Sequence, residues 1–180
     1  MSVTPSVILL RHTRPAVAEG ICYGRTDLDL APCFAAQAAR LACELPPLAA
    51  IVSSPLSRCL RLARAIADAR GLPHSIDARL IEMDFGRWEG QFWDAIPRAE
   101  IDAWAADLLH ARPHGGETVA ELAARARAAL DDLSRGPRPV LAVTHAGIIK
   151  AARAARDGAQ AWHSALPFAA WEVLAPPDGT

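Results

Sequence analysis

In the stretch Val7-Ile8-Leu9-Leu10-Arg11-His12, a short apolar run ends directly in basic side chains. The run predicts a buried strand over 6–10. The same pattern returns at Val140-Leu141-Ala142-Val143-Thr144-His145, where a second apolar strand over 140–143 also leads to a histidine. We therefore expect two central strands that each present a histidine just beyond their carboxyl end.

Helical and strand patterns alternate along the rest of the chain. Strands are predicted at 48–52, 75–81 and 171–174, the second at a sheet edge, and helices at 32–44, 54–70, 94–109, 118–134 and 147–156. Ser54 is the expected N-cap of its helix, with Pro55 at the first helical position. Thr118 and Glu121 have the spacing of a capping box. This alternation predicts an α/β protein, a three-layer αβα sandwich with a mostly parallel central sheet.

Length and composition favour one globular domain over 1–180. The chain has 180 residues, of which 52% are hydrophobic and 22% charged, and its formal net charge is −1. No broad basic field indicates a nucleic-acid partner, and no polybasic run indicates an anionic membrane. We find no basic leader segment and no apolar run long enough to span a bilayer, so we expect a soluble cytoplasmic protein.

The four cysteines do not form a metal-site pattern. Cys22, Cys33, Cys43 and Cys59 include no C-x-x-C pair and no spacing typical of zinc ligands. We expect them to be small buried or half-buried thiols in a reducing compartment. No H-E-x-x-H motif or close histidine–carboxylate cluster is present, so we expect neither a metal nor a cofactor.

Basic side chains converge at three predicted strand ends. His12 and His145 follow two strands, and the strand ending near Ser54 leads into a helix that carries Arg58. Ligands of open α/β sheets bind at the carboxyl ends of the strands. Arg11 adds a second guanidinium, and the planar fork of arginine fits phosphate oxygens. A lone histidine or arginine is more often structural, but this much positive charge is costly to bury without an anion.

Five segments resemble the motifs of the histidine phosphatase (phosphoglycerate mutase-like) superfamily, in the order in which that family has them. Arg11-His12-Thr13 resembles its Arg-His-Gly signature. The others are Ser54-Pro55-Leu56-Ser57-Arg58, the acid-bearing loop 82–90, His114-Gly115-Gly116-Glu117-Thr118, and Thr144-His145-Ala146-Gly147.

The resemblance implies a role for each matched residue. His12 is then the nucleophile, since a neutral imidazole attacks phosphorus well at physiological pH. Arg11 and Arg58 bind the phosphoryl oxygens, and His145 donates a hydrogen bond to them. Glu82 protonates the leaving alkoxide and later activates water.

Other acidic and polar residues leave alternatives open. Asp84 and Glu89 compete with Glu82 for the role of proton donor. Thr13, Arg25 and Glu117 are expected to contact the substrate, although a structural role for Glu117 before the capping box fits equally well. The chain departs from the family pattern at Thr13, where glycine is usual, at Arg14, where glutamate is frequent, and at Phe34, where glycine is frequent.

The resemblance predicts a metal-independent phosphomonoester hydrolase that works through a phosphohistidine on a small phosphorylated substrate. Phosphoglycerate mutases carry inserted segments for which this chain has no room. The stretch Cys22-Tyr23-Gly24-Arg25-Thr26-Asp27-Leu28-Asp29-Leu30 looks like that of bacterial α-ribazole phosphatases, which favours α-ribazole 5′-phosphate in cobalamin biosynthesis. The alternatives are a phosphomutase and an inactive member that only binds a phosphorylated ligand. The sequence leaves the oligomeric state undetermined.

Overall fold

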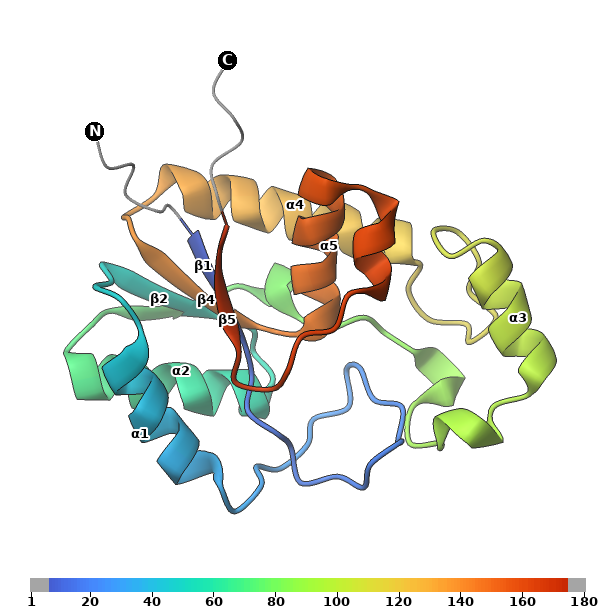
Figure 1. The fold of residues 1–180 in the computed structure, drawn as a ribbon, viewed down its shortest axis with the longest axis horizontal. Helices are drawn as coiled ribbons and strands as arrows, with labels where there is room; N and C mark the ends of the chain where they lie inside the picture. The colour runs from blue at the N-terminus through green and yellow to red at the C-terminus, as the bar shows by residue number, and fades with distance from the viewer. Residues whose placement is uncertain (1–6, 175–180) are drawn as a thin grey trace.

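A five-stranded sheet crosses the middle of the computed structural model, which describes residues 7–174 (Figure 1). Its strands are β1 Val7–Arg11, β2 Ala50–Ser53, β3 His74–Ile76, β4 Val140–Thr144 and β5 Trp171–Leu174. Their order is β3-β2-β4-β1-β5; all neighbours pair in parallel except β5, which runs antiparallel to β1. The predicted start of the first strand at Ser6 lies outside the described residues, as do both ends of the predicted domain 1–180, which stays a prediction.

Helices cover both faces of the sheet. The helices are α1 Phe34–Glu44, α2 Ser57–Arg70, α3 Arg98–Ala106, α4 Val119–Arg135 and α5 Ala146–Asp157. Figure 1 shows α1 and α2 on one face and α4 and α5 on the other, while α3 lies at the side of the molecule. The predicted three-layer αβα sandwich with a mostly parallel sheet is confirmed.

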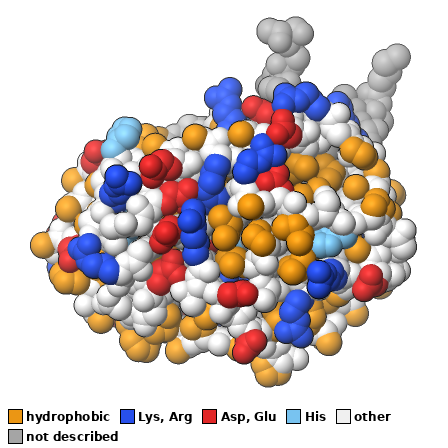
Figure 2. Space-filling model, turned by 180° about the vertical axis from the view of Figure 1, so that it is seen from behind, with side chains coloured by type: hydrophobic (Ala, Val, Ile, Leu, Met, Phe, Trp, Pro, Cys, Tyr) orange, Lys and Arg blue, Asp and Glu red, His pale blue; other side chains and the backbone are white. Residues whose placement is uncertain are grey.

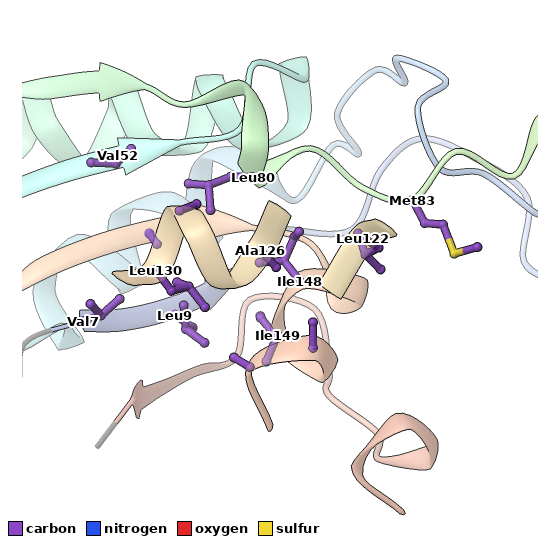
Figure 3. Close-up of a cluster of buried hydrophobic side chains, with 14 of the residues drawn as sticks. Val7, Leu9, Val52, Leu80, Met83, Leu122, Ala126, Leu130, Ile148 and Ile149 are labelled. Atoms are coloured by element: carbon purple, nitrogen blue, oxygen red, sulfur yellow. The ribbon is translucent and has the colours of Figure 1, made fainter. Parts of the chain in front are cut away.

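The alternation of side chains along β1 explains the layers, because successive residues of a strand point to opposite faces. Val7 and Leu9 join the cluster beneath α4 and α5 (Figure 3). Ile8 and Leu10 join the cluster beneath α1 and α2. All four side chains are completely buried, and each such burial contributes roughly 1.5–3 kcal/mol. The central strands are thereby held rigidly, and so are the residues that follow them.

The predicted N-cap of α2 is wrong. The helix begins at Ser57, and its N-cap residue is Leu56, whose side chain makes no cap hydrogen bond. The hydroxyl of Ser54 instead lies 2.8 Å from a ring nitrogen of His145. Asp27 takes over the capping, because its carboxylate accepts hydrogen bonds from Ser57 N at 2.8 Å and from Ser57 Oγ at 2.7 Å. A distant loop therefore caps this helix and occupies the backbone N–H of Ser57.

Two further element predictions need correction. The strand predicted over 75–81 is β3, which ends at Ile76, because Asp77 caps a 3-10 turn over Ala78–Leu80 by accepting a hydrogen bond from Arg79 N. The helix predicted over 94–109 is split into a 3-10 turn at Trp93–Ala95 and α3. Pro97 stands at the break, since proline lacks the N–H that a continuous helix needs and holds the preceding residue extended.

An aromatic cluster anchors the segment between β3 and α4. Trp88 is buried together with Cys22 and Ile96, and Trp93 and Trp104 pack against them. Backbone hydrogen bonds join Cys22 N to Gln91 O at 2.8 Å and Gly90 N to Cys22 O at 2.9 Å. The loop that follows β1 and the loop that follows β3 are therefore fastened to each other. The capping box of α4 at Thr118 and Glu121, which ends this segment, is confirmed.

Candidate active site

The register of the two central strands brings the two histidines together. Arg11 and Thr144 are paired residues of β1 and β4, so His12 and His145 leave the sheet side by side. A backbone bond of 3.0 Å from His12 N to Thr144 O continues the pairing. The two imidazole ring centroids are 5.1 Å apart. His12 is 2% exposed and His145 is completely buried, so the protein holds both rings in fixed positions.

The hydrogen bonding of His12 leaves one ring nitrogen ready to react. Nδ1 lies 2.7 Å from the carbonyl oxygen of Thr13. Because a carbonyl can only accept, Nδ1 carries the proton and Nε2 keeps its lone pair. Burial, reinforced by the charges of Arg58 and Arg11, lowers the pKa of His12 to about 3. The ring is therefore neutral near pH 7, which is the form a nucleophile requires.

Arg58 is a buried residue of the candidate site. Its side chain is completely inaccessible, so Arg58 is not a solvent-exposed helix residue. Nη1 donates to the Thr26 carbonyl at 2.8 Å and Nη2 to the Gly24 carbonyl at 2.6 Å. Nε has no acceptor within residues 7–174. A guanidinium has five N–H donors, so these two bonds fix its orientation and leave donors for an anion.

Arg11 is held from a different side. One of its terminal nitrogens donates to the carbonyl of Leu166, and its guanidinium carbon lies 3.9 Å from the ring centroid of Phe168. The Nε of Arg11 also has no acceptor in the described part of the chain. Burial lowers the pKa of this guanidinium, and the charges of Tyr23 and Glu82 oppose that shift. Glu82 thus interacts electrostatically with Arg11, whose charge in turn acts on His12 and His145.

Phe168 is a site residue that the sequence did not reveal. Its ring centroid lies 5.5 Å from that of His12, in addition to its contact with Arg11. The turn that carries it is tied to the site, because Ala169 N donates to His12 O at 3.1 Å. Ala169 has a positive φ of 59°, which costs a residue with a Cβ about 1–2 kcal/mol. No motif marks this turn, which lies more than 150 residues after His12.

His145 is positioned by the start of α2. Its Nε2 lies 2.8 Å from Ser54 Oγ and 3.4 Å from the sulfur of Cys59. Burial, followed by the charges of His12 and Arg58, holds the pKa of His145 well below its usual range. Nδ1 has only a 3.9 Å approach to the same sulfur. Nδ1 is thus the ring nitrogen with the most freedom to interact with a ligand.

Glu82 lies against the first turn of α5. Its Oε1 accepts a hydrogen bond from Met83 N at 3.0 Å, and its Oε2 accepts one from Gly147 N at 3.1 Å. A Cβ added at Gly147 would lie 2.2 Å from Oε1. Position 147 therefore needs glycine for the carboxylate to approach the helix end so closely. These two backbone donors fix the direction of the Glu82 carboxyl group.

The two competing carboxylates are engaged in holding loops. Glu89 accepts hydrogen bonds from Arg25 N at 2.9 Å, Thr26 N at 2.7 Å and Phe85 N at 3.1 Å, and another from the Thr26 hydroxyl. Asp84 Oδ1 accepts from Gly86 N at 2.8 Å, and its other oxygen lies 3.8 Å from the guanidinium of Arg25. Glu89 therefore fastens the loop whose carbonyls hold Arg58.

The remaining predicted contact residues differ in their surroundings. Glu117 forms a two-pronged ion pair with Arg125, at 2.6 and 2.8 Å, and its Oε2 lies 3.6 Å from Arg25. Arg25 is 44% exposed and reaches across the acidic loop. Thr13 is completely buried, and its hydroxyl has no partner among the residues described. Thr13 thus lies inside the site, whereas Glu117 is largely satisfied by Arg125.

Within residues 7–174, no group of three histidine, cysteine or acidic side chains is placed to hold a metal ion. No helix described there is long and apolar enough to cross a membrane. On the face seen in Figure 2, basic side chains are interspersed with acidic ones. Cys22 and Cys59 are buried as predicted, but the prediction is wrong for Cys33 and Cys43, which are exposed.

Comparison with known proteins establishes the class. The sequence profile of the histidine phosphatase superfamily (branch 1) matches residues 7–178. The chain belongs to this superfamily, as its five motifs predicted, and it is a phosphatase that acts on small phosphorylated substrates.

Individual relatives cover most of the chain. A glucosyl-3-phosphoglycerate phosphatase from Mycolicibacterium vanbaalenii is 35% identical over 185 residues, which span 93% of this chain and 78% of the relative. The structure of the α-ribazole phosphatase from Shigella flexneri superposes with a TM-score of 0.80 at 27% identity, covering 92% of this chain and 87% of that one. A mycobacterial glucosyl-3-phosphoglycerate phosphatase solved with inorganic phosphate gives a TM-score of 0.75 at 29% identity, covering 92% and 86% of the two chains.

Proposed function

We propose that this phosphatase hydrolyses phosphomonoesters through a phosphohistidine on His12. The observation that carries the proposal is the protonation of that ring: Nδ1 is committed to the Thr13 carbonyl, so the lone pair is on Nε2. The buried guanidinium of Arg58 and the half-buried guanidinium of Arg11 both act on His12, and each has a buried Nε–H without a partner within residues 7–174. A neutral nucleophile beside unpaired cationic donors suits a dianionic phosphoryl group.

The reaction takes two steps, the phosphorylation of His12 and the hydrolysis of the phosphohistidine. Nε2 of His12 attacks phosphorus while the ester P–O bond breaks, and Glu82 gives a proton to the departing alkoxide. Arg11, Arg58 and His145 bear the charge on the three phosphoryl oxygens in the transition state. Water then gives a proton back to Glu82 and attacks phosphorus, so the P–N bond breaks and inorganic phosphate leaves. No metal ion takes part in either step.

Two kinds of relative, one similar in sequence and one similar in structure, suggest two candidate substrates. The sequence motif at 22–30 favours α-ribazole 5′-phosphate, and the superposition with the Shigella flexneri enzyme supports the same choice. The 35% identity to the Mycolicibacterium vanbaalenii enzyme favours glucosyl-3-phosphoglycerate. We keep α-ribazole 5′-phosphate as one proposal and glucosyl-3-phosphoglycerate as the other. Hydrolysis rates of the two esters, measured side by side, decide between them by their kcat/KM values.

The phosphohistidine is tested by trapping it. Rapid quenching without acid, after mixing with ³²P-labelled ester in the presence of a chelator, should give an acid-labile and base-stable phosphoprotein. His12→Ala should abolish both the label and phosphate release. His110→Ala is the matched control, because His110 is 71% exposed and lies on a separate loop. Retained labelling in His12→Ala would assign the nucleophile elsewhere, phosphoryl transfer without phosphate release would indicate a mutase, and binding without turnover an inactive member.

A further inference from the structure

The hydroxyl group of Ser54 lies between the backbone and the second histidine of the site. Its Oγ accepts a hydrogen bond from Leu56 N at 3.3 Å and lies 2.8 Å from Nε2 of His145. Ser54 and His145 are both completely inaccessible to solvent. A buried hydroxyl group needs a protein acceptor for its proton. The position of that proton therefore depends on the atoms that surround Ser54.

The ring of His145 carries a single proton. Burial holds the pKa of His145 well below its usual range, so the ring is neutral near pH 7. A neutral imidazole has one N–H donor and one acceptor nitrogen, and the partners of the ring decide which nitrogen has the proton. With the proton on Nδ1, His145 donates to an anionic oxygen; with the proton on Nε2, the lone pair of Nδ1 repels it. The tautomer thus decides whether His145 can hydrogen-bond a phosphoryl group.

The neighbours of Ser54 fix the direction of its hydrogen bond to His145. The N–H of Leu56 only donates, so it cannot take the hydroxyl proton. The thiol of Cys59 lies 3.4 Å from the same ring nitrogen, but its S–H is directed to the carbonyl oxygen of Thr144. Sulfur is a weak acceptor, so within residues 7–174 the ring nitrogen is the strongest acceptor in reach of the hydroxyl group. Ser54 therefore donates to Nε2.

We propose that Ser54 is a positioning residue that fixes His145 in the tautomer with the proton on Nδ1. Within residues 7–174, Nδ1 has only a weak approach of 3.9 Å to the sulfur of Cys59. A buried N–H donor is thereby kept for a ligand. The inference rests on the proposed function, in which the acceptor is an oxygen of the phosphoryl group. Ser54 acts through His145 and does not itself touch that group.

Nitrogen-15 NMR of the histidine rings tests the tautomer directly. Long-range correlations from the ring C–H protons show which nitrogen of each imidazole is protonated. In the ligand-free wild-type protein near pH 7 we expect the proton of His145 on Nδ1. In Ser54→Ala we expect the form with the proton on Nε2 to gain population, because the hydroxyl donor is gone and the sulfur of Cys59 can accept. A wild-type ring with its proton on Nε2, or an unchanged ring in Ser54→Ala, would overturn the inference.

A neighbouring serine provides the matched control for the loss of a buried hydroxyl group. Ser53 is also completely buried, but its Oγ lies 2.9 Å from Nε2 of His74, in the edge strand β3. Ser53→Ala should leave the His145 tautomer and kcat/KM for p-nitrophenyl phosphate near those of the wild type. Ser54→Ala should lower this kcat/KM about ten- to hundredfold, because a hydrogen bond to a charged group is lost. Ser54→Thr keeps a hydroxyl group and should restore the tautomer together with part of the activity.

The spectrum and the activity together separate positioning from a merely structural role. Lost activity in Ser54→Ala with an unchanged tautomer would assign Ser54 to packing and overturn the inference. If Ser54→Ala does not fold, the tautomers of the wild type and of Ser54→Thr still decide the question.

The proposed function can fail independently of this inference. A wild-type protein that traps no phosphohistidine would contradict the proposed function, while the His145 tautomer and its response to Ser54→Ala would still support the role of Ser54. A normal phosphohistidine label together with a proton on Nε2 of His145 would overturn the inference and leave the proposed function in place.

Discussion

The carboxyl edge of the sheet and the loop that follows β3 both carry candidate catalytic residues, but the protein holds them by different means. At the sheet edge, His12 and His145 are fixed by the register of two parallel strands, and both are almost completely buried. On the loop, Glu82, Asp84 and Glu89 all lie within eight residues of sequence, and each is half-exposed. Strand register fixes the positions of the two histidines. Individual hydrogen bonds fix the position of each loop carboxylate and thereby its role.

This difference distinguishes residues proposed to act on the substrate from residues that hold the loops in place. At the sheet edge, buried donors of Arg11 and Arg58 lack partners in the described structure, which is typical of groups kept for a ligand. On the loop, Glu89 has four hydrogen bonds and holds the segment whose carbonyls orient Arg58. We therefore expect substitutions at the sheet edge to reduce activity, and those at Glu89 to reduce stability first.

Among substitutions that leave the nucleophile in place, the largest effect is expected at Arg58. Arg58→Met removes the buried guanidinium while keeping an unbranched apolar side chain, so it should lower kcat/KM for any phosphomonoester by about 10²–10³-fold. Inorganic phosphate should also bind more weakly in calorimetry. Arg64→Met, at an exposed position of the same helix, is the control and should leave both values near those of the wild type. Near-normal kcat/KM in Arg58→Met would remove this residue from the site.

A slightly smaller effect is expected at Glu82, on the order of 10²-fold. Glu82→Gln cannot donate a proton, so phosphorylation of His12 by an alkyl phosphate should be slow. A burst with p-nitrophenyl phosphate should persist, because p-nitrophenolate leaves without protonation, and release from the phosphoenzyme should be slow. Burst kinetics with both substrates measure the two steps separately. Equal loss in both bursts would indicate that Glu82 positions the site, and Asp84 would become the next candidate.

The sheet edge was predictable from sequence because its signals are local and periodic. Apolar runs locate β1 and β4, and the residue after each run must lie at the carboxyl edge of a parallel sheet. Arg11, His12 and His145 follow from that rule, Arg58 follows from the helix after β2, and the structure brings the four together. The resemblance of Arg11-His12-Thr13 and its partner motifs to a known family supplied the expected chemistry.

Long-range contacts were not predictable, because no local pattern encodes them. Asp27 caps α2 from a loop 30 residues away, which freed Ser54 to contact His145. Phe168 stacks on Arg11 from the turn before β5. The choice among the three loop carboxylates depended on bonds between Glu89 and residues 25 and 26, more than 60 positions earlier. Pro97 was a local signal for the break before α3. We nevertheless predicted one helix over 94–109, because the helix propensity of the surrounding residues outweighed that signal.

Glu89 should reveal its supporting role in stability. Glu89→Gln replaces one of the two oxygens that together accept three backbone N–H groups, and the NH₂ that takes its place cannot accept from them. We expect a loss of roughly 1–3 kcal/mol in the free energy of unfolding, measured by urea denaturation. The phosphohistidine label should still form in the folded fraction. Glu44→Gln, at an exposed site in the last turn of α1, is the control. Unchanged stability with lost labelling would make Glu89 a catalytic residue.

The effect that is smallest at neutral pH is a pH dependence of stability that comes from the sheet edge itself. Burial lowers the pKa of His12 to about 3, whereas an unfolded histidine titrates near 6.5. Between these two values the unfolded chain binds a proton that the folded chain does not, so stability rises with pH across this window. The contribution is fully present above about 6.5 and is lost as pH falls toward 3.

His12→Gln should therefore remove up to about 1.4 kcal/mol per pH unit from the slope of unfolding free energy between pH 6 and pH 4. Above pH 7.5 both forms of residue 12 are neutral, and the slopes should agree. Identical slopes between pH 6 and pH 4 would mean that His12 is protonated in the folded protein, which would contradict its assignment as a neutral nucleophile.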